Sequence, residues 1–370
     1  DLNTSYGIKK LKRPAWKPQP QYRSKTGAGA GWNQAIRPQI NSKDLFNINE
    51  EESGSFRACG FGTVLTHQND GIARGSGLLT TLNDKNENKS VLISKASAHY
   101  SLNKGSSRQK FPSSLMGTLA LINQTYLDAE WYDQNNIPVY NRSVEAGNNL
   151  QDLPQIFEVN DKLDIQRVWK IADEFEKDYI LIGNGDEYQR TSFLTESNFA
   201  VVLPINFPKP YDVTIPDAAS MLSLQKMKHW EMAPSNPAVL VDNDIFICLS
   251  TTDLDNKSDF LSNLRKAISF GLKKQDALAA LTTNPAELIE ASNLLGTLSE
   301  GKLANFLVCS DDIFENGTIL SNWVQGDKYI INSEIDFDPR GTYLSSNKDT
   351  IIIFGSLESP KAKIVEDSTT

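Results

Sequence analysis

The sequence has few of the residues that build metal and disulfide sites, and it has no long hydrophobic run. Its 370 residues include three histidines and three cysteines. Cys59, Cys248 and Cys309 are odd in number and widely spaced, which matches neither a disulfide framework nor a zinc-binding pattern. No apolar run approaches the ~20 residues that span a bilayer. The formal net charge of −9 argues against nucleic acid as a partner, because phosphate binding needs a basic surface.

The composition is otherwise that of a chain with a large buried core. Its length and its hydrophobic content of 39% allow one large unit with an appendage. Helical patterns separate several short, apolar runs, which is typical of parallel strands buried on both faces. The predicted strands are 62–67, 179–182, 199–203 and 245–249, and the predicted helices are 42–59, 113–132, 164–176, 218–232 and 260–270.

This alternation predicts an α/β fold, a TIM-like (β/α)8 barrel, over residues 1–295. A doubly wound open sheet is the alternative. A further pair of predicted strands, 78–82 and 91–94, flanks a polar turn at 83–86 and interrupts the alternation, so we interpret the pair as an insertion. Toward the end of the chain, the runs 323–331 and 350–354 are alternating or apolar. They predict a small C-terminal β-strand region over residues 296–370.

In a parallel barrel, functional side chains lie on loops that follow the carboxyl ends of the strands. His67 and His99 stand at two such ends. Asp186, Glu187 and Asp253 follow other strands and form a predicted acidic cluster. A pair of carboxylates can carry out acid–base chemistry when burial separates their pKa values. The alternative interpretation is that these carboxylates cap helices.

The most informative stretch joins the predicted barrel to the C-terminal strands. Leu281-Thr-Thr-Asn-Pro-Ala286 ends one helix and lets Pro285 start the next. Gly296-Thr-Leu-Ser-Glu-Gly-Lys-Leu-Ala-Asn305 then passes two glycine turns into an apolar run at 303–308. In this order the segments resemble the C-terminal signature of the amidohydrolase superfamily, in the branch of imidazolonepropionase-like metal-dependent hydrolases. The resemblance covers most of the chain, from Asp1 to about Ile331.

The resemblance implies a barrel with a small β-sandwich that the C-terminal strands complete. It implies hydrolysis of carbon–nitrogen bonds other than peptide bonds, with zinc or another divalent metal. It also implies a strand-forming segment ahead of the barrel, so we expect this chain to be a fragment. Residues 32–38 and 113–117 look like segments of family members that carry two amidohydrolase-like units in one polypeptide. This chain resembles the degenerate first unit, so a second unit is an expected partner. We expect a soluble protein, exported or periplasmic if a signal peptide precedes the fragment.

The family's D-x-H-x-H metal frame corresponds to Asp1-Leu-Asn-Thr-Ser5, with Asn3 and Ser5 in place of both histidines. Asn184 and Asn206 follow central strands where the family has further histidines. Asp253 matches the family's final-strand aspartate, which accepts a proton from metal-bound water. Amide and hydroxyl groups are weak metal ligands beside imidazole. We therefore predict no metal ligand and no cofactor in this chain.

Two hypotheses remain open. In the first, the chain is a degraded barrel that binds a small-molecule ligand or supports a neighbouring catalytic unit. In the second, it is a working hydrolase of a cyclic or linear amide, built around Asp253 as the catalytic residue. The candidate pocket residues are Asn3, Ser5, His67, His99, Asn184, Asp186, Glu187 and Asn206.

Overall fold

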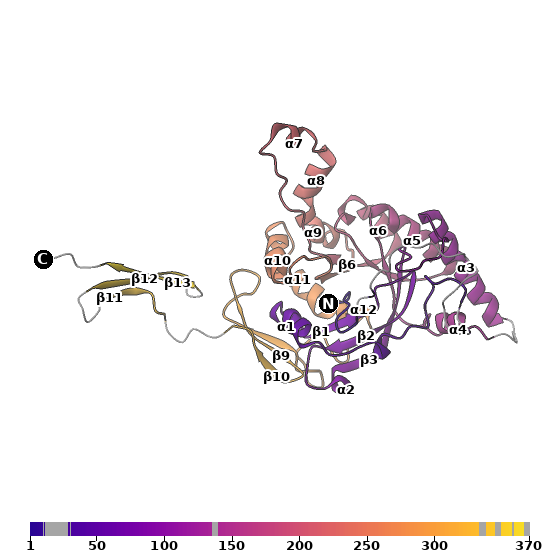
Figure 1. Cartoon of the computed structure of the whole chain (residues 1–370), viewed down its shortest axis with the longest axis horizontal. Coiled ribbons are helices and arrows are strands. Elements are labelled where there is room, and N and C mark those ends of the chain that lie inside the picture. Colours follow the sequence, from indigo (N-terminus) through magenta and orange to yellow (C-terminus); the bar gives the residue numbers. More distant parts are fainter. Residues whose placement is uncertain are drawn as a thin grey trace.

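The computed structural model describes residues 1–9, 11, 29, 31–134, 140–332, 338–344, 349–356 and 359–365. Within these residues, no helix is both long and apolar enough to cross a membrane. The fold is mixed α/β, with one large sheet, surrounding helices and two smaller sheets (Figure 1).

The large sheet has seven strands that follow one another in chain order. Strands β3 to β7 are parallel, whereas β1 pairs with β2, and β2 with β3, in the antiparallel sense. The sheet is therefore parallel over most of its width and opens with an antiparallel meander. The strands are β1 (Thr63–Thr66), β2 (Ala73–Thr81), β3 (Val91–Ser101), β4 (Gln155–Glu158), β5 (Tyr179–Ile182), β6 (Ala200–Pro204) and β7 (Ile247–Ser250).

Helices cover the outer face of this sheet, while α7 and α8 project away from the body (Figure 1). Helix α5 shows why such a segment is helical: Asp161 caps its first turn, and Ile165, Val168 and Ile171 form a buried stripe at helical spacing. The helices are α1 (Glu50–Ala58), α2 (Glu87–Ser90), α3 (Leu115–Gln134), α4 (Arg142–Asn148), α5 (Lys162–Phe175), α6 (Thr191–Ser197), α7 (Pro216–Ser220), α8 (Leu224–Met232), α9 (Asn236–Val241), α10 (Phe260–Ser269), α11 (Lys274–Leu281) and α12 (Thr283–Leu288).

The strands separate two apolar cores, because successive side chains of a strand point to opposite faces. Phe157 and Leu181 pack against the helices in the larger core. Their neighbours Ile156 and Ile182 belong to a second core on the inner face of the curled sheet. The inner core is entirely apolar: Leu2, Leu65, Leu79, Ala96, Ile156, Ile180, Ile182, Val202, Cys248, Ile289 and Ala291.

The N-terminal segment joins the two edges of the sheet. Its backbone bonds to β1, from the Leu65 amide to the Asp1 carbonyl at 2.8 Å and from the Thr4 amide to the Leu65 carbonyl at 3.1 Å. The Asp1 carboxylate reaches the end of β7. One oxygen accepts from Ser250 Oγ at 2.7 Å, and the other accepts from the Thr251 amide at 2.9 Å and Thr251 Oγ1 at 2.6 Å. Asp1 thus fastens β1 to β7 across the opening.

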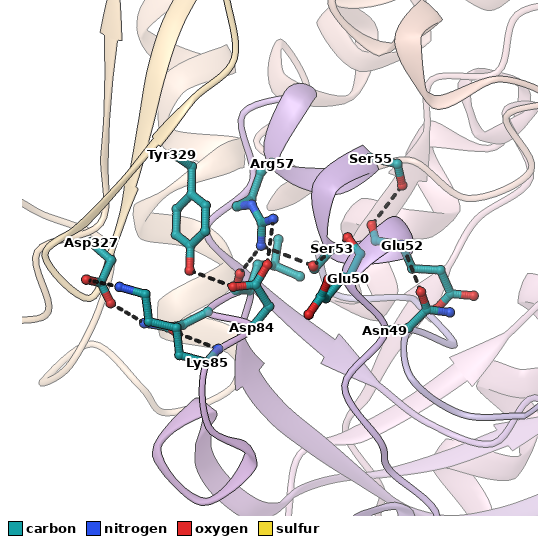
Figure 2. Close-up of polar contacts among 12 residues, drawn as sticks. Asn49, Glu50, Glu52, Ser53, Ser55, Arg57, Asp84, Lys85, Asp327 and Tyr329 are labelled. Atoms are coloured by element: carbon teal, nitrogen blue, oxygen red, sulfur yellow. Dashed lines mark hydrogen bonds and ion pairs between the residues drawn. The ribbon is translucent and has the colours of Figure 1, made fainter.

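A three-stranded antiparallel sheet packs beside α1 and is held there by Arg57. Its strands are β8 (Phe306–Cys309), β9 (Ile319–Val324) and β10 (Asp327–Ile330). Figure 2 shows Arg57 between Tyr329 and Asp84. Its guanidinium carbon lies 3.9 Å from the centre of the Tyr329 ring, and Nη2 donates to Asp84 Oδ2 at 3.0 Å. The Tyr329 hydroxyl donates to the other Asp84 oxygen at 3.0 Å. One buried cation therefore connects α1, the β2–β3 turn and β10.

A second three-stranded sheet lies apart from the rest of the molecule in Figure 1. It consists of β11 (Gly341–Leu344), β12 (Thr350–Ser356) and β13 (Ser359–Val365), paired antiparallel. Large apolar side chains are exposed on all three strands, among them Leu344 at 76%, Phe354 at 46% and Ile364 at 64%.

The α/β class and the parallel strands of the second half are as predicted, with residues 179–182 matching β5 without a shift. Several expectations need correction. The strand pair at 78–82 and 91–94 is no insertion: β2 and β3 are longer and lie inside the main sheet. The helix expected over 42–59 starts only at Glu50, and that over 218–232 is divided into α7 and α8. The complete eightfold barrel and the division at residue 295 stay predictions.

Candidate functional site

A layer of polar side chains caps the inner apolar core at the carboxyl ends of the parallel strands. Asn3 is at its centre. Its amide nitrogen donates to Thr252 Oγ1 at 3.0 Å, and its amide oxygen lies 2.9 Å from His67 Nε2. Because that oxygen is an acceptor, His67 Nε2 is the donor in this pair. We call this layer the mouth, and it comprises Asn3, His67, Arg74, Ser97, His99, Glu158, Ser250, Thr252 and Asp253.

The two histidines of the mouth lie face to face. The ring centroids of His67 and His99 are 3.7 Å apart with an interplanar angle of 10°, and each residue is only 2% exposed. His99 Nε2 lies 2.8 Å from Ser97 Oγ. Burial lowers the pKa of His67 to about 3, and the positive charge of Arg74 contributes to this shift. Burial also lowers the pKa of His99 well below its usual value, helped by His67 and Arg74. Both imidazoles are therefore neutral at physiological pH.

The lowered pKa values of these two histidines predict that the protein loses stability in acid. Each histidine has a lower pKa in the folded protein than the ~6.5 of an unfolded chain, so the unfolded state takes up protons first. The contribution of the two neutral histidines to the free energy of unfolding is complete above pH ~6.5. It is lost as the pH falls toward the pKa values that the histidines have in the folded protein. Each histidine should add about 1.4 kcal/mol per pH unit to the slope of unfolding free energy in that window.

Urea denaturation at a series of pH values measures this slope. His67→Gln, which keeps a donor for Asn3, should reduce the slope by the contribution of one histidine. The control is Gln225→Ala on α8, a helix without buried residues, because it replaces a side chain that does not titrate and should leave the slope unchanged. Equal slopes for the wild type and His67→Gln would contradict the prediction.

Asp253 stands at the edge of the mouth in a strained backbone conformation. Its φ of 59° lies in the left-handed region, which is uncommon for residues other than glycine. Asn206 holds this loop, because its side-chain amide donates to the Asp253 carbonyl at 2.6 Å. Desolvation raises the pKa of the Asp253 carboxyl, and repulsion from Glu158 adds to the shift. The mouth thus contains one carboxyl group that gains a proton more readily than usual.

Arg74 and Glu158 are mouth residues that the sequence analysis missed. Arg74 is 3% exposed, and its Nη1 donates to Glu158 Oε2 at 2.5 Å. Two signals were present in the sequence. Arg74 is a charged residue in the stretch Ile72-Ala-Arg-Gly-Ser-Gly-Leu78, and Glu158 ends the short strand Gln155-Ile-Phe-Glu158, which was not recognised.

Asp186 and Glu187 lie in the loop after β5, which Glu187 anchors. The buried Glu187 carboxylate accepts hydrogen bonds from the backbone amides of Asn184 and Gly185 and from Asn236 Nδ2, the last at 2.7 Å. Burial raises the pKa values of both Asp186 and Glu187. The Asn184 residue is exposed, and Ser5 is half-buried. The hydrogen bonds of Glu187 are those of a loop anchor, and they join α9 to this loop.

A larger apolar groove lies elsewhere on the sheet. It has a volume of about 800 Å³ and runs between α10–α12, β8 and the start of β1. Phe260, Leu278 and Phe306 line it. None of the predicted pocket residues contributes to this groove. The predicted pocket residues and the groove are therefore separate features, although Asp1 lines the groove and bonds to Ser250 of the mouth.

Residues 236–341 match the amidohydrolase family, over a range that begins at α9 and includes the junction motif and β8–β10. This match covers less than a third of the chain, so it shows that this part is similar to the amidohydrolase family. No curated protein matches the sequence. An amidohydrolase from Thermotoga maritima MSB8 has a similar fold, with a TM-score of 0.65 and 18% identity over 89% of this chain and 94% of that one.

Other solved hydrolases resemble smaller parts of this amidohydrolase-like chain. Ochratoxinase from A. niger has a TM-score of 0.36 and 18% identity, covering 54% of this chain and 47% of that one. A molinate hydrolase has a TM-score of 0.35 and 15% identity, covering 54% and 49%. The statement that this chain has a similar fold therefore rests on the comparison with the Thermotoga protein.

The mouth does not fit the divalent metal that the superfamily implies. Among the described residues, no three or more His, Cys, Asp or Glu side chains gather closely enough to hold a metal ion. The Asn3 oxygen is already bonded to His67, and the ring of His67 is stacked on that of His99. A metal ion at Asn3 would have to displace hydrogen bonds between buried groups in exchange for weak amide ligation.

Proposed function

We propose that this chain is a noncatalytic amidohydrolase-fold unit that lacks the metal centre of its superfamily and acts by binding a ligand or supporting a neighbouring unit. The observation that carries the proposal is the bonding of Asn3. At the position of a metal-binding histidine, an amide donates to Thr252 and accepts from His67. Both polar ends of the Asn3 amide are therefore bonded within the mouth instead of being directed at an ion.

The electrostatics of the mouth support the same conclusion. Metal-dependent hydrolysis needs basic ligands and a carboxylate that takes the proton of the bound water. His67 and His99 are neutral, but they are stacked, and their rings have bonds to Asn3 and Ser97. Arg74 adds a buried positive charge, which repels a divalent cation, although its pairing with Glu158 offsets part of that charge.

A supporting role would use surfaces away from the mouth. The β11–β13 sheet exposes Leu344, Phe354 and Ile364, and apolar side chains grouped on one small sheet are typical of contact surfaces. A second amidohydrolase-like unit in the same polypeptide is the partner that we propose for this supporting role. A small molecule at the mouth would donate a hydrogen bond to the Asp253 carboxylate, because Asn3 and Arg74 are already bonded to other mouth residues.

The test combines metal content with hydrolysis. Protein purified after growth with added zinc should contain well under one metal ion per chain by elemental mass spectrometry. It should not hydrolyse a panel of hydantoins, dihydropyrimidines and linear amides. The double variant Asn3→His, Ser5→His is the matched control, because it restores the two ligands of the superfamily frame and should raise the zinc content. Stoichiometric zinc in the wild type, lost in Asp253→Ala, would overturn the proposal.

A metal-free hydrolase built around Asp253 is the second candidate. It is favoured by the left-handed backbone of Asp253 and by the raised pKa of its carboxyl beside Glu158. Turnover without metal in the same screen would support this candidate. That activity should disappear in Asp253→Asn and persist in Asp255→Asn, because Asp255 is exposed and pairs with Lys209.

A further inference from the structure

The apolar groove between α10–α12, β8 and the start of β1 extends from solvent into the interior of the protein. Leu278 and Leu298 line it and are 52% and 73% exposed. It also reaches Leu2, Leu65 and Leu79, which are buried and belong to the inner apolar core. The groove therefore has an apolar wall that continues from exposed side chains to buried ones.

The lining of this groove has almost no charge. Among the described residues that line it, only Asp1 is charged. Its carboxylate already accepts hydrogen bonds from Ser250, from Thr251 and from the Asn3 amide. Moving an ionised group from water to apolar surroundings without a partner is costly, so this lining favours an uncharged occupant.

Asn305 and Thr282 are polar side chains of the lining, and both have partners within the protein. Asn305 Nδ2 donates to Thr63 Oγ1 at 2.9 Å, and Asn305 Oδ1 accepts from the Gln325 amide at 2.7 Å. Thr282 Oγ1 donates to the Leu278 carbonyl at 2.7 Å. An occupant of the groove would therefore be held by apolar contacts more than by hydrogen bonds.

The edge strands of the large sheet are also partly occupied, which makes an added peptide strand a poor fit. On β1, the Thr63 carbonyl accepts from the Asp1 nitrogen at 3.1 Å, and the Leu65 amide donates to the Asp1 carbonyl at 2.8 Å. On β7, the Ile247 carbonyl accepts from Asn284 Nδ2 at 2.8 Å. A peptide would bring backbone groups that find these positions taken, and buried backbone groups without partners are unfavourable.

The volume of the groove sets the size of the occupant. At about 800 Å³, it lies within the ~300–1,000 Å³ of small-molecule sites, which are mostly apolar. It is roughly five times the ~150 Å³ of an engineered cavity that accommodates benzene, so a single ring would fill only a small part of it. We propose that the groove binds an uncharged molecule with a long hydrocarbon chain, of the class of the fatty alcohols.

A series of straight-chain alcohols tests this proposal. Isothermal titration calorimetry of the whole protein should show one saturable site for decan-1-ol and weaker binding of octan-1-ol and hexan-1-ol. Each pair of methylene groups should change the affinity roughly tenfold, because the added groups leave water for apolar surroundings. Decane-1,10-diol should bind at least about tenfold more weakly than decan-1-ol, because its second hydroxyl would be buried without a partner.

Two variants of the lining locate the binding site. Leu278→Asp should weaken the binding of decan-1-ol at least about tenfold, because it places a carboxylate in the groove. Leu298→Asp, at a more exposed residue of the lining, should weaken it in the same direction. The matched control is Leu127→Asp, which should keep the wild-type affinity. Leu127 lies on α3, is 48% exposed and does not line the groove.

Circular dichroism checks that each variant folds. The proposal is overturned if decan-1-ol shows no saturable binding, or if the affinity does not rise from hexan-1-ol to decan-1-ol. It is also overturned if both lining variants bind decan-1-ol as tightly as Leu127→Asp does. The measurement depends on neither metal nor turnover, and the groove includes none of the predicted pocket residues, so its outcome is independent of the proposed function.

Discussion

Replacing Arg57 by methionine should lower the free energy of unfolding by about 3–5 kcal/mol, the range for breaking a buried ion pair from one side. Arg57 has a side chain that is 8% exposed, and its partner Asp84 is 19% exposed. Methionine keeps much of the side-chain volume. It removes the bonds to the Leu82 carbonyl, to Ser53 and to Asp84, together with the contact on Tyr329 (Figure 2).

Most of this loss should come from the carboxylate that is left behind. Without Arg57, Asp84 keeps only the Tyr329 hydroxyl among these partners and stays largely buried as an unpaired charge. The double variant Arg57→Met, Asp84→Leu should therefore be more stable than Arg57→Met alone, because both charges are removed together.

Urea denaturation followed by circular dichroism measures both changes. The control is Arg340→Met, which removes an exposed arginine from its pair with Asp338 and should cost much less stability than the loss of Arg57. The account of Arg57 is wrong if its replacement costs no more than that of Arg340. It is also wrong if removing Asp84 as well adds a further loss.

Asp1→Ala should destabilise the fold by about 2–4 kcal/mol, because it removes the acceptor for several hydrogen bonds between distant segments. The Asp1 carboxylate accepts from Ser250 and Thr251 at the end of β7, and from the Asn3 amide at 3.1 Å. In the variant, the buried groups of Ser250 and Thr251 lose a charged partner. The contacts between the N-terminal segment and β7 would then depend on Asn3 and Thr252.

Hydrogen exchange localises this effect more sharply than a global measurement. The amides of Thr251 and Leu65 should exchange faster in Asp1→Ala, since the first bonds to the lost carboxylate and the second to the Asp1 carbonyl. Amides of β5 should be much less affected by local opening. Asp255→Ala is the control, because Asp255 is exposed and pairs with Lys209. Unchanged exchange at Thr251 would contradict the role of Asp1.

The second half of the fold could be predicted because its local patterns agree with its tertiary structure. Strand β5 is wholly apolar, and α10 is amphipathic, so periodicity alone located both. Strand β4 was missed because its apolar pair, Ile156 and Phe157, lies between Gln155 and Glu158. The polar residues at the ends of such a short strand lie at the rim of the sheet. No local sequence pattern indicates that position.

Less of the candidate site could be predicted. The matched frame located Asn3 and Asp253, and strand ends located His67 and His99, which the structure places in one layer. The pairing of Arg74 with Glu158 depends on how β2, β3 and β4 are registered, over a separation of 84 residues. The sequence also grouped Asp186 and Glu187 with Asp253, and that grouping stays a prediction. What it did not indicate is that Glu187, in the loop after β5, bonds to α9. The position of a residue along a strand can be read from the local sequence. The residues that a loop contacts cannot be read in this way.

The antiparallel meander of β1, β2 and β3 has a consequence for the order of folding. Thr66 pairs with Leu78 and Thr81 with Thr63, so this part of the sheet closes over short stretches of chain. The bonds from Thr251 to Asp1 close over 250 residues. Loop closure costs more entropy as the loop lengthens, and local contacts form earlier. We therefore expect the meander to form before the N-terminal segment reaches β7, so that the mouth is completed only in the last step of folding.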